Sequence, residues 1–217
     1  MKAISLLTRR ADLSRDAFRH YYEEIHSPLA IAHFPYRQYT RNHLVDEVGG
    51  LDFDCISEFQ MQRGFDIRQA MQSRSRALMR DDERKFMRPE RIRVAMSEES
   101  VMVEGAKTED ALSQLRYALL FSRAGRSQTE FRREVEAWAR SLSRDIRGLR
   151  RMSLDLLSPV VGSDFPFDAL LWLQLDQHPE RPPGLTGPAP GLLAAVQVHT
   201  HSSSAQQLKQ GFVAFLP

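Results

Sequence analysis

The side chains best suited to acid–base chemistry gather in one short stretch near the start of the chain. Pro28 is expected to end or kink a helix just after His26, so this imidazole would lie at a helix C-terminus, where the helix dipole favours a proton. Tyr39, Arg41 and His43 alternate along a predicted strand, and alternate residues of a strand point to the same face. Because an imidazole titrates near neutral pH, His26 and His43 are candidate general bases.

Each of these residues also has a purely structural interpretation. His26 could cap its helix end, and Tyr22 and Tyr39 could be core residues with a hydrogen-bonded hydroxyl. His199 and His201 stand two apart on a predicted strand, a spacing found among metal ligands, but the sequence offers no obvious third ligand nearby. The sequence therefore predicts no metal site, and the polar cluster of the first helix and second strand carries the prediction.

An internal repeat organises the chain. A shift of 113 residues, with one further inserted residue before the third strand, aligns the two halves. The aligned pairs are Leu6-Leu7 with Leu119-Leu120, Ser14 with Ser127, Phe18-Arg19 with Phe131-Arg132, and Phe53-Asp54 with Phe167-Asp168. We therefore expect one unit at residues 1–104 and a degenerate second unit at 105–217, with the boundary near Gly105.

The second copy has lost the candidate catalytic residues. The alignment places Ala139 opposite His26, Met152 opposite Tyr39, Leu154 opposite Arg41 and Leu156 opposite His43. Since the three strand counterparts are apolar, the strand face that they share is an interior one. Polar side chains on the same face of the first copy therefore need partners or a ligand. This difference predicts a single functional site per chain, in the first unit.

The hydrophobic pattern predicts the same order of elements in each copy. Strands are expected at 3–7, 36–44, 53–61 and 92–97, with helices after Ser14 and at 65–86. In the second copy, strands are expected at 117–121, 149–157, 167–175 and 192–200, with a helix after Ser127. The second copy is also expected to contain a proline-rich loop at 177–191 and to end in a C-terminal tail.

Strand 167–175 is apolar on both alternating faces, so the sheet should carry helices on one face and a second sheet on the other. The predicted fold class is α+β. Two tandem ferredoxin-like βαββαβ units would have their antiparallel sheets facing each other as an intrachain dimeric α+β barrel.

Composition excludes several classes of function. The net charge is +2, which gives no electrostatic reason to expect nucleic acid or a membrane surface as a partner. The lone cysteine, Cys55, cannot form an intramolecular disulfide. The first apolar run is too short for a signal peptide, so a cytoplasmic location is expected.

Several of these residues carry a family resemblance. The sequence Glu24-Ile25-His26-Ser27-Pro28-Leu29, followed by Phe34-Pro35, Tyr39 and Asn42-His43, resembles the EthD family of dimeric α+β barrel proteins over roughly residues 1–100. The family usually has Pro-Gly where this chain has Pro35-Tyr36. The resemblance implies a pocket for a small aromatic or polyketide-like molecule, without metal or cofactor, and relatives that include anthrone-type dehydratases or oxidases.

Taken with that resemblance, the residues suggest a mechanism. His26 or His43 would take a proton from an acidic C–H or a phenol, and Tyr39 would donate a hydrogen bond to the developing oxyanion. Dehydration, cyclisation, isomerisation and cofactor-free oxygenation all fit this scheme. The residues expected to bind the substrate are Tyr22, Phe34, Arg41, Glu58 and Phe59.

Two other functions remain open at this stage. The pocket could hold a small hydrophobic molecule without turnover, or the chain could be an accessory protein of a catabolic or biosynthetic cluster. A small aromatic or hydrophobic molecule is the expected partner, and a homodimer of chains is also left open.

Overall fold

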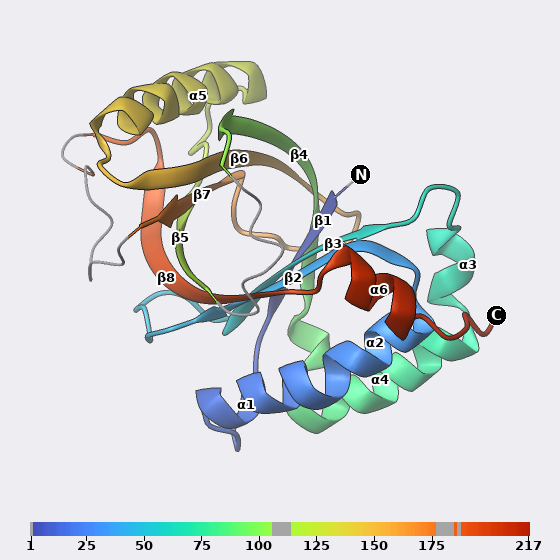
Figure 1. The fold of residues 1–217 in the computed structure, drawn as a ribbon. Helices are drawn as coiled ribbons and strands as arrows, with labels where there is room; N and C mark the ends of the chain where they lie inside the picture. Colours follow the sequence, from blue (N-terminus) through green and yellow to red (C-terminus); the bar gives the residue numbers. More distant parts are fainter. Residues whose placement is uncertain (1, 106–113, 177–184, 186–187) are drawn as a thin grey trace.

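The computed structural model describes residues 2–105, 114–176, 185 and 188–217, and within them eight antiparallel strands close into a barrel (Figure 1). Around the barrel the order is β1-β3-β2-β8-β5-β7-β6-β4. The strands are β1 Lys2–Leu7, β2 Tyr36–Leu44, β3 Cys55–Met61, β4 Arg93–Val103, β5 Gln114–Phe121, β6 Leu149–Pro159, β7 Ala169–Leu175 and β8 Leu192–Ser202.

Helices cover the barrel from two opposite sides (Figure 1). Those of the first half lie on one side, α5 lies across the barrel from them, and α6 follows the last strand back to the first half. The helical segments are α1 Arg15–Tyr21, η1 Tyr22–His26, α2 Ser27–His33, α3 Ile67–Met71, α4 Arg74–Phe86, η2 Pro89–Arg91, α5 Gln128–Asp145 and α6 Ala205–Gly211. None of the helices in the described ranges has the length and apolarity needed to cross a bilayer.

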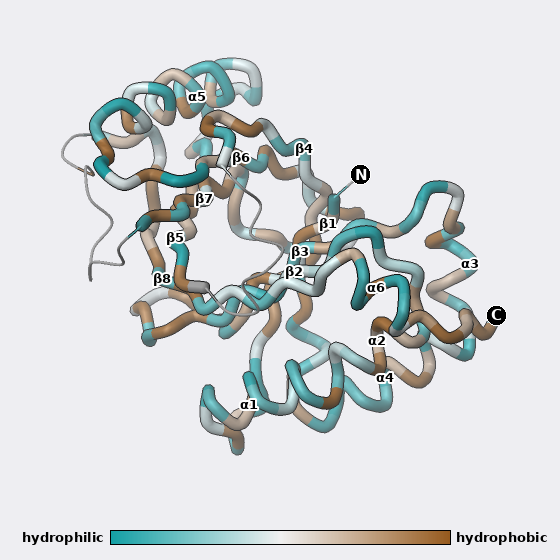
Figure 2. The backbone as a smooth tube through the Cα atoms, viewed as in Figure 1, coloured by the Kyte–Doolittle hydropathy of each residue, from teal (hydrophilic) through white to brown (hydrophobic). Residues whose placement is uncertain are grey.

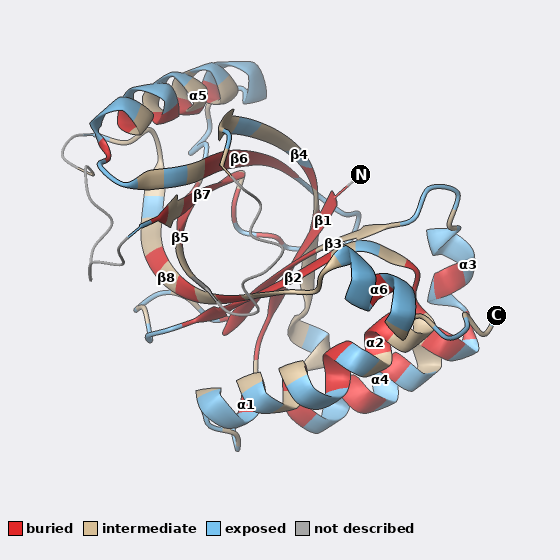
Figure 3. Cartoon of the chain, in the orientation of Figure 1, coloured by how far each residue is buried: buried red, intermediate tan, exposed pale blue. Residues whose placement is uncertain are grey.

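Three hydrophobic cores follow from this arrangement. One fills part of the barrel interior and the other two lie between the barrel wall and the helices of each half. The strands are therefore largely buried, while the helices expose one face (Figure 3). The helices carry hydrophilic and hydrophobic residues in alternating patches (Figure 2), as expected for elements with one face toward a core.

Most predicted elements are present, with different ends. β2 has the predicted bounds, whereas β4, β6 and β8 are longer than predicted and β3 and β7 begin two residues later. The predicted helix at 65–86 is two helices, because Ser73 caps a new one through its contact with the amide of Arg76. Helix α6 was not predicted; it begins in a capping box formed by Ser204 and Gln207.

The alignment of the first strands was wrong by one residue. Leu6 pairs with Ile56, and the residue in the same place of the second half is Leu120, which pairs with Leu170. The true offset for this strand is therefore 114. A slip of one residue exchanges the two faces of a strand, so Leu6 corresponds to the barrel-facing Leu120 and not to Leu119. Residues 106–113, which directly follow the predicted unit boundary at Gly105, and most of the proline-rich segment 177–191 lie outside the described residues.

A buried charged cluster joins the two halves inside the barrel. The Lys2 ammonium donates to Glu58 at 3.0 Å and to Asp155 at 2.7 Å. Burial alone lowers the pKa of Lys2, but the charges of Glu58 and Asp155 outweigh it and raise the pKa above its ordinary value. On the other side Arg116 donates to Asn42 at 2.7 Å and stacks over Trp172 at 3.8 Å. Each cation thus contacts both halves of the chain.

Replacing Lys2 by methionine should destabilise the fold strongly. The substitution keeps the side chain's length but leaves Asp155 buried without its cation and Glu58 with Arg116 as its remaining cation. We expect the free energy of unfolding, measured in urea, to fall by about 3–5 kcal/mol. Arg84→Met is the control, since its pair with Asp81 is exposed and should contribute less than about 1 kcal/mol. Equal effects of the two substitutions would contradict this role of Lys2.

Candidate active site

A π-helical turn at Tyr22–His26 presents the first polar residues to the barrel wall. The amide of Ser27 donates to the Tyr22 carbonyl, five residues back, and the Ser27 hydroxyl donates to the Glu23 carbonyl at 3.0 Å. Such wide turns often mark functional sites. The helix then continues to His33, with Pro28 at the start of α2 directly after the π-helical turn. The prediction that His26 lies at a helix C-terminus is therefore wrong.

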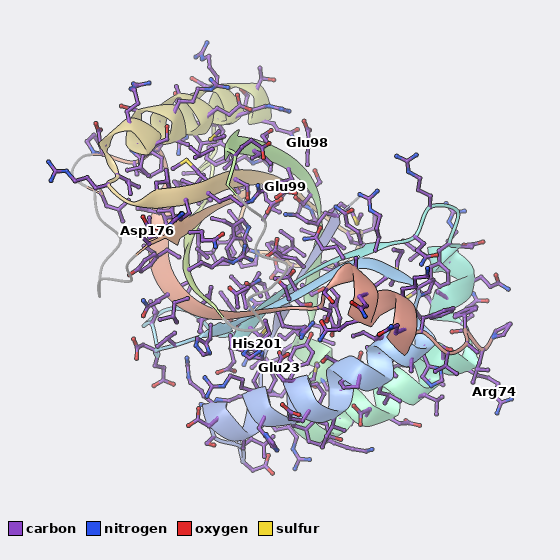
Figure 4. All side chains as sticks on the ribbon, viewed as in Figure 1. Glu23, Arg74, Glu98, Glu99, Asp176 and His201 are labelled. Atoms are coloured by element: carbon purple, nitrogen blue, oxygen red, sulfur yellow. The ribbon has the colours of Figure 1, made fainter. Side chains whose placement is uncertain are left out.

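The second group of polar residues comes from two adjacent strands. β2 and β8 pair so that Arg41 lies opposite His201 and His43 opposite His199. Residues directly opposite in a sheet share a face, and here that face is turned toward the η1 turn. Glu23 from that turn lies 3.8 Å from the His201 ring, and Figure 4 shows the two side chains next to each other. We call Glu23, Arg41, His43, His199 and His201 the seam site.

Glu23 is the centre of the seam site. Arg41 donates to it through Nη2 at 2.6 Å, and the His43 Nε2 lies 2.7 Å from its Oε1. Burial by itself raises the pKa of Glu23, but the hydrogen bond to His43 and the Arg41 charge outweigh it and lower the pKa to about 2. Glu23 is therefore ionised at neutral pH and can only accept hydrogen bonds.

The ionised Glu23 fixes the tautomer of His43. Burial, with a contribution from Arg41, lowers the pKa of His43 below its ordinary value despite the opposing effect of Glu23, so the ring is neutral at pH 7. Because Glu23 accepts from Nε2, the single ring hydrogen sits there and Nδ1 carries the lone pair. This Nδ1 is buried and has no hydrogen-bond partner. A neutral nitrogen of this kind can take a proton from a ligand.

The three predicted catalytic residues meet around Tyr22. Its ring lies edge-on to His26 at 5.3 Å and to His43 at 5.5 Å, and the Tyr39 hydroxyl donates to the Tyr22 hydroxyl at 3.2 Å. His26 Nδ1 lies 2.9 Å from the Asp82 carboxylate. The hydrogen bond to His26 is the main reason why the pKa of Asp82 falls to about 2. Both histidines are thus held by ionised carboxylates.

The predicted substrate-binding residues divide into three places. Tyr22 and Arg41 belong to the cluster just described. Glu58 lies on the other face of β3, in the charged cluster inside the barrel, so it is separated from the histidines by the sheet. Phe34 and Phe59 lie at the other end of the helix layer, in a group of aromatic rings with Tyr36, Tyr39, Phe65 and Phe215.

A narrow crevice reaches this region from outside. It has a volume of about 30 Å³ and is lined by Phe18, Arg19, His43 and Leu44, among others. That volume suits a water molecule or a single hydroxyl group. An aromatic ring is larger, so it would lie at the mouth of this crevice unless α1 moves.

Sequence reasoning missed Glu23 and Asp82, the carboxylates that hold the two histidines, and considered His199 and His201 only as metal ligands. Glu23 could have been found from its position three residues before His26, which puts both on one side of a helix. The strand histidines could have been found from their alternation, which puts both on one face of the strand. Among the described residues, no group of three or more histidine, cysteine or acidic side chains is arranged to hold a metal ion.

Comparison with known proteins finds one matching domain model and several similar folds. The chain aligns with the crystal structure of an anthrone oxidase-like protein, at 12% identity and a TM-score of 0.58, over 93% of this chain and 92% of that one, which shows a shared fold. A candidate monooxygenase from Lactobacillus acidophilus aligns at 10% identity over 94% of this chain and 93% of the other, but its TM-score of 0.49 is too low to support an argument. No curated protein matches the sequence. Residues 10–90 match the EthD domain, and this range includes the motifs around His26 and His43.

Proposed function

We propose that the chain is an enzyme that removes a proton from a small aromatic, phenolic or polyketide-like molecule, with His43 as the general base. The observation that carries this proposal is the buried, neutral His43, whose Nδ1 lacks a partner while its Nε2 is held by ionised Glu23. A carboxylate behind an imidazole orients the ring and stabilises the imidazolium that forms when the ring takes a proton. The EthD domain and the anthrone oxidase-like structure support this substrate class.

The chemical step needs only groups of this chain. A C–H or O–H bond of the substrate breaks, its proton passes to His43 Nδ1, and the electron pair moves onto the substrate oxygen. The enolate or phenolate that results accepts a hydrogen bond, for which the Tyr39–Tyr22 hydroxyl pair is the candidate donor. Dehydration, cyclisation, isomerisation and cofactor-free oxygenation can each begin with this proton transfer.

We also propose that the halves are tandem ferredoxin-like units with one site per chain, in the first unit. The strand orders β4-β1-β3-β2 and β8-β5-β7-β6 support this, because each half places its elements in the same sequence around the barrel. In the second half Met152, Leu154 and Leu156 are buried against α5, where the first half has Tyr39, Arg41 and His43. The same layer is therefore an apolar core in one half and a polar site in the other.

Anthrone has an acidic methylene C–H, so hydrogen exchange at this methylene tests the proposal directly. The wild-type protein should accelerate deuterium uptake at that methylene from D2O, followed by NMR. His43→Phe fills a similar space without a nitrogen and should lower the catalysed rate by about 10²–10⁴-fold. His20→Phe, at an exposed position of α1, is the control and should exchange like the wild type. Binding of anthrone without exchange would favour the non-catalytic binder instead.

Glu23→Gln tests how the base is oriented. A glutamine amide can donate to His43 Nε2, which would move the ring hydrogen to Nδ1 and remove the lone pair that takes the proton. The exchange rate should fall by about 10²–10⁴-fold although the pocket keeps its shape. Because Glu23 raises the pKa of His43, its loss should also lower that pKa further, which an NMR titration of the ring measures. An unchanged rate and titration would rule out this role of Glu23.

A further inference from the structure

The second half of the chain supplies another buried imidazole to the site. His201, on β8, lies directly opposite Arg41 on β2, and its ring is 5.6 Å from that of His43 with the planes nearly perpendicular, at 82°. His201 Nε2 is buried and has no hydrogen-bond partner, which is also true of His43 Nδ1. Two neighbouring rings from different halves of the chain thus each have a buried nitrogen with no partner.

Both nitrogens are best described as acceptors. Burial, with smaller effects of His43, Arg41 and His199, lowers the pKa of His201 to about 4, although Glu23 acts in the opposite direction. The neutral ring has one hydrogen, and the nearby Glu23 carboxylate, 3.8 Å from Nδ1, favours that hydrogen on Nδ1. Nε2 of His201 then carries a lone pair, as Nδ1 of His43 does.

Buried acceptors without partners are costly, and they are well suited to a ligand that donates hydrogen bonds. An anion is disfavoured, since both nitrogens present lone pairs. A ligand with two hydroxyl groups satisfies both nitrogens at once. The crevice at His43 has room for a hydroxyl, about 30 Å³, but not for a ring, so the ring would lie outside the crevice. His201 is itself partly exposed.

We propose that His201 completes the site of the first half, and that His43 and His201 together bind two neighbouring hydroxyl groups of an aromatic diol. This inference rests on the proposed function and narrows its substrate class. It also gives the second half a direct part in the site. That part comes from β8, the strand that pairs with β2, and not from a second copy of the polar cluster.

Binding of three matched compounds tests the inference. Catechol has two neighbouring hydroxyls, phenol has one, and 1,2-dimethoxybenzene has none that can donate. We expect catechol to bind the wild type roughly tenfold more tightly than phenol, the effect of one added hydrogen bond, and dimethoxybenzene to bind more weakly than either. Imidazole ¹⁵N shifts should change at both His43 Nδ1 and His201 Nε2 on addition of catechol.

The variant His201→Phe should abolish the preference for catechol over phenol while leaving the affinity for phenol within about twofold. His20→Phe is the matched control and should keep the preference. If His201→Phe lowers the thermal unfolding midpoint markedly, the smaller His201→Leu replaces it in the same comparison. Catechol binding no tighter than dimethoxybenzene, absence of catechol binding, or a preference that survives loss of His201 would overturn the inference.

Deuterium exchange on anthrone separates this inference from the proposed function. Exchange depends on His43 and Glu23, whereas the diol preference also requires His201. A protein that prefers catechol through His201 but catalyses no exchange would support the binding site and contradict the enzyme. Exchange without any diol preference would support the enzyme and contradict this inference.

Discussion

Closure of the barrel is the constraint on which the rest of the structure depends. Each half contributes four strands whose outer edges, β2 and β4 in the first half and β6 and β8 in the second, would otherwise leave backbone groups unpaired. Pairing of β2 with β8 and of β4 with β6 satisfies all four edges within one chain. It also brings side chains of the two halves into contact, so that Lys2 reaches Asp155 inside the barrel and His201 reaches His43 outside it.

The two helix layers show what the polar site requires of its surroundings. In the second half, α5 is an uninterrupted 18-residue helix that packs on apolar side chains. In the first half, the corresponding helix contains a π-helical turn and a proline, and Glu23 on that turn neutralises Arg41 and orients His43. Burying a charge is tolerable only when its partners are close, so the irregular turn and the charged strand residues depend on each other.

Sequence could predict the elements that rest on local patterns and not those that depend on distant pairing. Ser14 and Ser127 begin helices as expected, because an N-cap acts within one turn. The first strand was misaligned by one residue, since an apolar strand buried on both sides carries no alternation to fix its register. The alternation of Tyr39, Arg41 and His43 correctly grouped them on one face, but nothing local could show that β8 would lie beside β2 and add His201 to the site.

The pairing of β2 with β8 explains how a half without its own polar cluster can still contribute to the seam site. The helix layer of the second half lies on the far side of the barrel, where apolar side chains form a well-packed core. The last strand of that half, β8, in contrast, pairs both with β5 of its own half and with β2 beneath the helices of the first half. A residue on the outer face of β8 therefore lies beside the polar residues of the first half. His201 has this position, and its unpartnered buried nitrogen follows from it.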